Sequence, residues 1–190
     1  MSTLRLVPEA SLRTQAWVNG AGTTTVIASG PDEEHWQWRL SIAEIARDCA
    51  FSAYPDTRRQ LVTLDAPLHL RFGDSRNVSL LRLSPILFDG DDAPDASLPE
   101  GATRAFNLML RGTADGELIA RPLNGSMWLP QRKHWRWFMH LLSGHAEIEA
   151  GSERIAVSAG SNLWIDARPG ERVRIEGGGE LVLVQLANLD

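Results

Sequence analysis

Short runs of alternating apolar and polar residues, separated by glycine and proline, dominate this sequence. Sixteen glycines and ten prolines are spread over 190 residues, and the runs between them are rich in Val, Ile, Leu, Trp and Thr. Alternation with a period of two is typical of β-strands with one buried face, and no amphipathic run has the length of a helix. The chain is therefore predicted to be all-β. The expected strands span 23–28, 36–45, 60–72, 77–83, 104–111, 134–142, 145–149, 153–157, 162–165, 172–175 and 180–187.

The segments between these runs indicate how the strands are arranged. The stretches "EAGSE", "ARPGE" and "EGGGE" (residues 149–153, 167–171 and 176–180) are turn signals between short strands, a pattern that favours a sandwich or barrel over alternating β and α elements. The acidic segment 89–103 is expected to be an ordered surface loop that crosses between two similar halves. Its aspartates do not have the spacing of a calcium-binding loop.

Composition excludes several classes of partner. The formal net charge of −5 opposes sequence-independent binding to a phosphate backbone, so we expect no nucleic-acid partner. A single cysteine, Cys49, cannot form an internal disulfide. Residues 1–13 carry charge and proline where a signal peptide needs an apolar run, and the longest apolar stretches are about half the length of a membrane-spanning helix. We expect a cytoplasmic protein with no membrane contact.

The histidines do not form a metal site. Transition-metal sites in β-barrels combine closely spaced histidines with a carboxylate, but this chain has no His-x-His pair. In "GHAEIE", alternation places His145, Glu147 and Glu149 on the solvent face of a strand. His134 and His140 lie about 20 Å apart along a strand, too far to share one ion. We therefore expect no metal and no cofactor. The five histidines are His35, His69, His134, His140 and His145.

The stretch "AWVNGAGTTTVIA" (residues 16–28) contains two closely spaced glycines. A phosphate-binding loop would need a lysine and a following helix, whereas a β-branched run follows here. Gly20 and Gly22 are therefore expected to form a tight turn with positive φ. Such a turn would leave Trp17 and Asn19 free to contact a ligand.

The sequence shows no sign of a catalytic nucleophile. Cys49 has no local partner for nucleophilic catalysis, and no G-x-S-x-G motif occurs.

Two predicted strands carry polar side chains on one face. In "WQWRLSIAEIA", Arg39 and Ser41 share a face, where an arginine could hold a carboxylate by two hydrogen bonds. In "AFNLMLR", Asn107, Met109 and Arg111 share a face. Each pattern also fits a strand face exposed to solvent.

A further stretch, "FSAYPDTRR", places Phe51, Tyr54, Pro55 and Arg59 in a loop that leads into the next strand. Together with "WVNGAGTT", "WRLSIAEIA", "PILFDG" and "FNLM", it resembles the HutD/Ves family over nearly the whole chain, in order and approximate spacing. The C-terminal half also resembles the core of a cupin barrel, and the N-terminal half has a similar order of strands and turns.

The resemblance implies a bicupin, with an N-terminal cupin-like barrel over residues 1–112, a C-terminal one over 113–190, and no conserved metal set. HutD accompanies histidine-utilisation genes as a regulator or ligand-binding protein, and Ves-type members are described as stress-induced. This chain departs from the family pattern at Val18, Thr25, Val26 and Ala105. The matching positions are Trp17, Asn19, Gly22, Thr24, Arg39, Ser41, Phe51, Pro55, Arg59, Asn107 and Met109.

These observations support a metal-free protein that binds a small carboxylate metabolite of histidine breakdown and acts as a sensor. Arg39 and Arg59 would pair with the carboxylate, and Trp17 would line the pocket. The remaining predicted ligand contacts are Asn19, Ser41, Asn107 and Met109. The alternatives are a metal-independent enzyme with His140 or Glu44 as acid or base, and a protein-interaction module. A homodimer is compatible with the sequence.

Overall fold

The computed structural model describes residues 3–187 and groups them into two β units. Unit 1 contains residues 3–10 and 115–187, and unit 2 contains residues 11–114. A one-turn 3-10 helix, η1 (Glu9–Ser11), stands at the junction. Among the described residues, no helix reaches the length and hydropathy that crossing a membrane requires.

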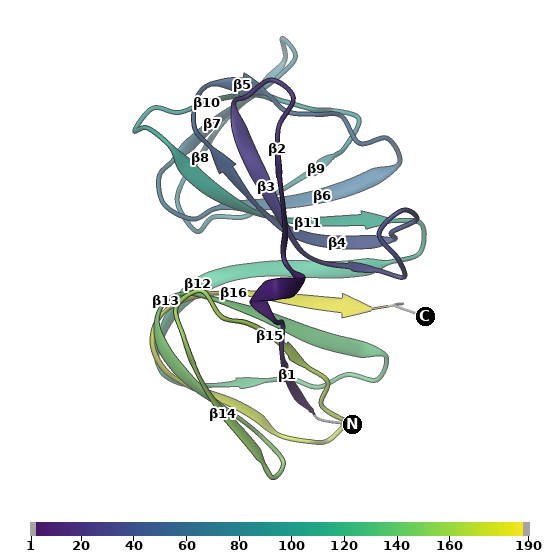
Figure 1. The fold of residues 1–190 in the computed structure, drawn as a ribbon, viewed down its shortest axis with the longest axis vertical. Helices are drawn as coiled ribbons and strands as arrows, with labels where there is room; N and C mark the ends of the chain where they lie inside the picture. The colour runs from purple at the N-terminus through teal and green to yellow at the C-terminus, as the bar shows by residue number, and fades with distance from the viewer. Residues whose placement is uncertain (1–2, 188–190) are drawn as a thin grey trace. The chain divides into compact units, whose positions relative to one another are not determined.

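Unit 1 is built on one six-stranded antiparallel sheet (Figure 1). Five strands follow the order β1, β15, β13, β16, β12, and β14 pairs with β13. Their bounds are β1 (Leu4–Leu6), β12 (Asp115–Leu129), β13 (Trp135–Ala150), β14 (Glu153–Ser158), β15 (Asn162–Ile165) and β16 (Val173–Ala187).

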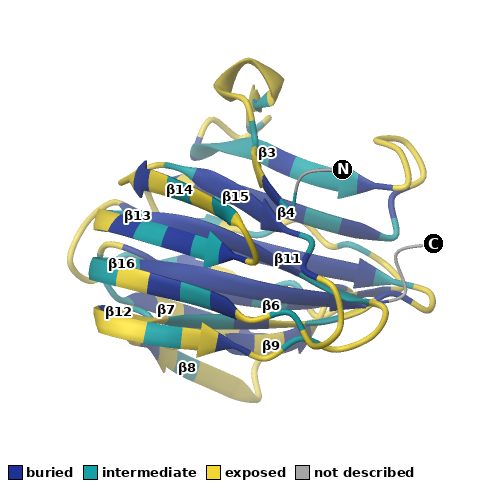
Figure 2. Ribbon diagram, turned by 90° about the horizontal axis from the view of Figure 1, so that it is seen from below, coloured by how far each residue is buried: buried dark blue, intermediate teal, exposed yellow. Residues whose placement is uncertain are grey.

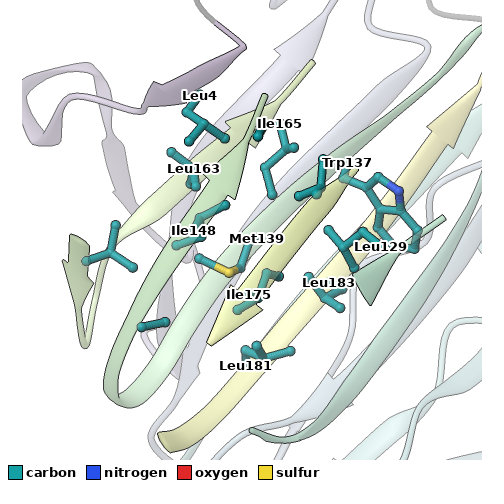
Figure 3. Close-up of a cluster of buried hydrophobic side chains, with 14 of the residues drawn as sticks. Leu4, Leu129, Trp137, Met139, Ile148, Leu163, Ile165, Ile175, Leu181 and Leu183 are labelled. Atoms are coloured by element: carbon teal, nitrogen blue, oxygen red, sulfur yellow. The ribbon is translucent and has the colours of Figure 1, made fainter. Parts of the chain in front are cut away.

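The long strands of unit 1 alternate between a buried and a more exposed face over part of their length, as in residues 145–150 of β13 and 173–176 of β16 (Figure 2). Residues 137–141 and 181–187 of the same strands are buried throughout. Met139, Ile175 and Leu183 belong to a continuous apolar cluster on the buried side (Figure 3). On the other side of β13, His145 is exposed, and Glu149 forms ion pairs with arginines on the two neighbouring strands. Alternation therefore predicted the solvent face of this hairpin correctly.

Unit 2 contains a six-stranded and a four-stranded antiparallel sheet. A second apolar cluster, which includes Phe72 and Phe88 in edge-to-face contact at 5.4 Å, forms its core. The first sheet has the order β2 (Arg13–Ala16), β3 (Gly22–Gly30), β4 (Trp38–Ile45), β11 (Thr103–Arg111), β6 (Thr57–Thr63), β9 (Ile86–Asp89). The second has the order β5 (Cys49–Ala50), β10 (Asp95–Ser97), β7 (Leu68–Phe72), β8 (Arg76–Leu80).

Several features differ from the sequence-based expectations. The expected strands 134–142 and 145–149 form the single strand β13, and the expected strand 60–72 is divided into β6 and β7. No strand was predicted over β12, because Pro122 and Gly125 interrupt the pattern. Among the described strands β12 pairs with β16 alone, and an edge strand tolerates proline. The "EGGGE" stretch lies inside β16 rather than in a turn. Its glycine at 179 allows a close approach to β13, since a Cβ there would lie 1.9 Å from the Ser143 carbonyl oxygen. Segment 89–103 does not cross between the halves: it lies within unit 2 and contains β10.

The N-terminal segment groups with the C-terminal unit. β1 pairs with β15, and the Glu153 carboxylate accepts hydrogen bonds from the backbone N–H groups of Thr3 and Leu4, at 2.8 and 3.1 Å. The sequence-based division assigned residues 1–112 to one barrel and 113–190 to the other, whereas the contacts divide after residue 114 and place residues 3–10 in unit 1. The sequence-based division also covers residues 1–2 and 188–190, which lie outside the described residues.

The turn before β3 is formed by backbone and side-chain hydrogen bonds. The Trp17 N–H donates to the Gly22 carbonyl at 2.9 Å, and the Gly20 N–H donates to the Trp17 carbonyl at 3.0 Å. Gly20 has a φ of +64°, as predicted. Gly22 does not have positive φ. Glycine is required at this position for another reason: a Cβ would lie 2.0 Å from the Glu44 carbonyl oxygen on β4.

We predict that Gly22→Ala lowers the free energy of unfolding by about 1–3 kcal/mol, because the added methyl forces β3 away from β4. Gly178→Ala is the matched control, since its nearest neighbour would be 3.9 Å away and it also lies in a paired strand. Urea unfolding of both variants checks the difference. Equal stability of the two variants would show that the close approach at Gly22 does not constrain the fold.

Candidate functional site

One cavity of about 480 Å³ in unit 2 brings together all the residues predicted to bind ligand. This volume lies within the range of small-molecule sites. The predicted residues that line it are Trp17, Asn19, Arg39, Ser41, Arg59, Asn107 and Met109. The other lining residues are Gln15, Ala16, Val18, Thr24, Ala43, Ala50, Phe51, Ser52, Tyr54 and Leu61. We call this the unit 2 cavity.

The floor of the cavity is a grid of side chains on three adjacent strands. Met109 on β11 lies opposite Arg39 on β4 and Arg59 on β6. One pair further along, Asn107 lies opposite Ser41 and Leu61. Because opposed residues in paired strands point to the same face, all six side chains project together. The Cα atoms of Arg39 and Arg59 are therefore about 10 Å apart, two strand spacings.

Arg59 is the most buried charge in the cavity. Its side chain belongs to a residue only 5% exposed. Nη1 donates to the Ser52 carbonyl at 3.3 Å, and Nη2 donates to Asn107 Oδ1 at 3.2 Å. The buried Nε has no hydrogen-bond acceptor among the described residues. A guanidinium has five N–H groups, so most of its donor capacity is not used by the protein.

Three aromatic rings surround this guanidinium. The Cζ atom of Arg59 lies 5.6 Å from the ring centre of Phe51, 5.4 Å from that of Tyr54 and 4.9 Å from that of Phe88. Burial lowers the pKa of Arg59 to about 10, with an opposing contribution from Tyr54 and a smaller lowering by the charge of Arg39. At neutral pH the group is still protonated, so the cavity contains a desolvated positive charge.

Arg39 supplies a second positive charge. It is half-buried and forms no hydrogen bond or ion pair with any described residue. No aspartate or glutamate is among the described residues that line the cavity. A buried charge without a counter-ion is unfavourable by several kcal/mol, and a carboxylate that pairs with a guanidinium removes most of that cost. The cavity therefore has the electrostatics of an anion site.

Some of the neutral polar groups that line the cavity have hydrogen-bond partners among the described residues, and others do not. Ser41 is 3% exposed, and its hydroxyl has no hydrogen-bond partner among residues 3–187 although it lines the cavity. Trp17 and Asn19, which were expected to contact a ligand, both line the cavity, and the side chain of each also makes a hydrogen bond within the protein. Trp17 Nε1 donates to Thr24 Oγ1 at 2.7 Å, and Asn19 Oδ1 accepts from the Ala21 N–H at 3.0 Å. Only the amide nitrogen of Asn19 is left for a ligand.

Some residues that line the cavity were not among the predicted ligand contacts. Leu61 could have been found by parity, since it lies two residues beyond Arg59, and alternation places Ala43 on the same face as Arg39 and Ser41. Arg111 shares a predicted face with Asn107 and Met109 but does not line the cavity. Its Nε donates to Thr57 Oγ1 at 2.9 Å, and its guanidinium lies 3.8 Å from the ring centre of Trp36.

The acid–base candidates do not line this cavity. Glu44 is exposed on the face of β4 opposite Arg39 and accepts a hydrogen bond from the Thr23 hydroxyl at 3.5 Å. His140 lies in unit 1, where its Nδ1 is 2.9 Å from Asn162 Oδ1. Among the described residues, no group of three or more His, Cys, Asp or Glu side chains is placed to hold a metal ion.

Solved structures of other proteins resemble this architecture. HutD from Pseudomonas fluorescens has a TM-score of 0.78 at 22% identity, over 97% of this chain and 98% of that one. A cupin 2 conserved barrel domain protein from Leptotrichia buccalis has a TM-score of 0.55 at 8% identity, over 95% and 90% of the two chains. These likenesses, with the two β units, show an all-β bicupin fold.

Sequence comparison gives the family. Protein Ves from Escherichia fergusonii is 37% identical over 98 residues, which are 50% of this chain and 51% of that protein. The chain thus spans about half the length of the curated relatives it matches. The family model of HutD matches residues 9–183, nearly the whole chain. The chain belongs to the HutD family.

Proposed function

We propose that this protein is a cytoplasmic sensor that binds a small carboxylate metabolite in the unit 2 cavity. The observation that carries the proposal is the pair of arginines, one of them buried, in a cavity whose lining contains no acidic side chain. Arg59 and Arg39 flank Met109, so a carboxylate above Met109 can be approached by both guanidinium groups. Arginine forms planar two-point contacts with carboxylates.

Family membership suggests where the ligand comes from. HutD takes its name from histidine utilisation, so urocanate, formylglutamate and formiminoglutamate are the first candidates, and each carries at least one carboxylate. A regulatory role fits the lining, which offers cations, amides and hydroxyls. General acid–base catalysis needs a titratable group within hydrogen-bond reach of the substrate, and neither Glu44 nor His140 lines the cavity.

A ligand series tests the proposal. Purified protein is heated with histidine, urocanate, formiminoglutamate, formylglutamate and glutamate, and each compound that stabilises it is then incubated with the protein and assayed for conversion. At a hundred times its dissociation constant, a ligand adds about 2.7 kcal/mol to the free energy of unfolding. We expect stabilisation without conversion. Absence of any stabilisation contradicts the binding function, and conversion of the ligand contradicts the sensor role.

We predict that Arg39→Lys weakens carboxylate binding although the charge is retained, because an ammonium cannot reproduce the two-point contact. The expected loss is about 1.5–3 kcal/mol, the range for a hydrogen bond to a charged group. Titration calorimetry with the tightest ligand of the series measures it. Arg71→Lys, on the exposed face of β7 and outside the lining, is the control and should bind like the parent. Equal affinity of both variants would place Arg39 outside the binding contacts.

We also predict that the dissociation constant for a carboxylate ligand with no other titratable group, such as glutarate, stays constant between pH 6 and pH 9. The pKa of Arg59 is lowered only to about 10, so it remains charged over this interval, and ordinary carboxylic acids are ionised well below it. Since a bound anion favours protonated Arg59, the affinity should fall only as the pH rises past about 10. Titrations in matched ionic strength check this. A step near the ordinary pKa of histidine, about 6.5, would implicate a histidine instead.

A further inference from the structure

The unit 2 cavity is rich in hydrogen-bond donors and poor in acceptors. Arg39 has no protein partner among the described residues, and Arg59 uses only part of its donor capacity. Because the Oδ1 atoms of Asn19 and Asn107 already accept hydrogen bonds from the protein, both side-chain amides are oriented with the nitrogen available to the cavity. The Asn107 nitrogen makes one long contact, 3.3 Å to the Ala105 carbonyl.

The acceptors that face the cavity are few and uncharged. The Ser52 carbonyl is occupied by Arg59 Nη1, and Thr24 Oγ1 is occupied by the Trp17 indole. The hydroxyls of Ser41 and Tyr54 can accept but carry no negative charge. Gln15 lies on the exposed strand β2, where its amide remains in contact with water. None of these groups can act as a counter-ion for a cation.

An ammonium group would therefore be poorly accommodated beside a bound carboxylate. In a free α-amino acid the ammonium is attached one carbon from the carboxylate, so pairing the carboxylate with Arg59 brings the ammonium close to the same guanidinium. The two like charges repel, and the repulsion is strong where water is excluded. The ammonium would also lose its hydration without gaining an anionic acceptor.

We infer that the cavity selects carboxylates that carry no ammonium group and rejects free α-amino acids. This inference rests on the proposed binding function and narrows its ligand class. Acids whose nitrogen is absent, acylated or part of a neutral ring satisfy the donors without introducing a second cation. The selectivity comes from Arg39, Arg59 and the fixed amides rather than from cavity size, so it should act on ligands of equal length.

Two matched pairs test the inference. Glutarate and L-glutamate differ by one ammonium group, as do 3-phenylpropanoate and L-phenylalanine. Titration calorimetry at pH 7.5 measures all four dissociation constants. We expect the ammonium-free member of at least one pair to bind, and its amino acid to bind at least tenfold more weakly. Equal or tighter binding of the amino acid in that pair overturns the selectivity but leaves the binding function intact. Failure of both ammonium-free acids to bind overturns the inference and the proposed function together.

A cavity variant tests the cause of the selectivity. Arg39→Gln removes one cation and adds an amide oxygen, so the ratio of the dissociation constants of amino acid and ammonium-free acid should fall at least threefold. Arg71→Gln, outside the lining, should keep the parent ratio, and thermal melting of both variants confirms that they fold. Because the readout is a ratio, a general loss of affinity does not mimic the effect. An unchanged ratio in Arg39→Gln, with affinity for the ammonium-free acid still measurable, overturns the electrostatic explanation.

Discussion

A guanidinium buried among aromatic rings, with no carboxylate beside it, is the interaction on which the rest of the site depends. Removing a charge from water without a counter-ion costs several kcal/mol. Contacts between Arg59 and the rings of Phe51, Tyr54 and Phe88 offset part of that cost, at about 0.5–2 kcal/mol each. Two hydrogen bonds to Ser52 and Asn107 offset more. A remaining deficit can be removed by an anion from outside, which is why this arrangement is suited to binding.

The sheet fixes the positions of the side chains in that arrangement. Arg39, Met109 and Arg59 come from three adjacent antiparallel strands, so their spacing is set by backbone pairing rather than by loops. Side chains on regular elements hold their geometry better than side chains on loops. The rim is the turn before β3, which is itself fixed: Arg47 Nη2 donates to the Asn19 carbonyl at 2.9 Å, and Gly22 allows β3 to approach β4 closely. Floor and rim are thus both held by contacts within the protein.

The sequence predicted which side chains share a face of a strand better than it predicted which strands lie side by side. A period of two is a local property, so it correctly grouped Arg39 with Ser41 and Asn107 with Met109. It could not show that β11 lies between β4 and β6, because pairing between strands distant in sequence leaves no local signal; only the family resemblance joined Arg59 to the others. The hydrogen bond that Asn19 makes within its own turn could not be predicted either, for a related reason. An amide can complete its own turn or contact a ligand, and its sequence context is the same in both cases.

Unit 1 shows what the same architecture does without the charges. There β16 lies between β12 and β13, and Leu183 is opposite Ile119 and Met139, a three-strand row comparable to that of Arg39, Met109 and Arg59. All three residues of the unit 1 row pack into its apolar cluster. An apolar row contributes to stability by being removed from water, whereas the unit 2 row places two cations where burial opposes them. Two arginines on strands that flank a methionine therefore make the unit 2 row less favourable to bury than the unit 1 row, and an anion in the cavity would offset that difference.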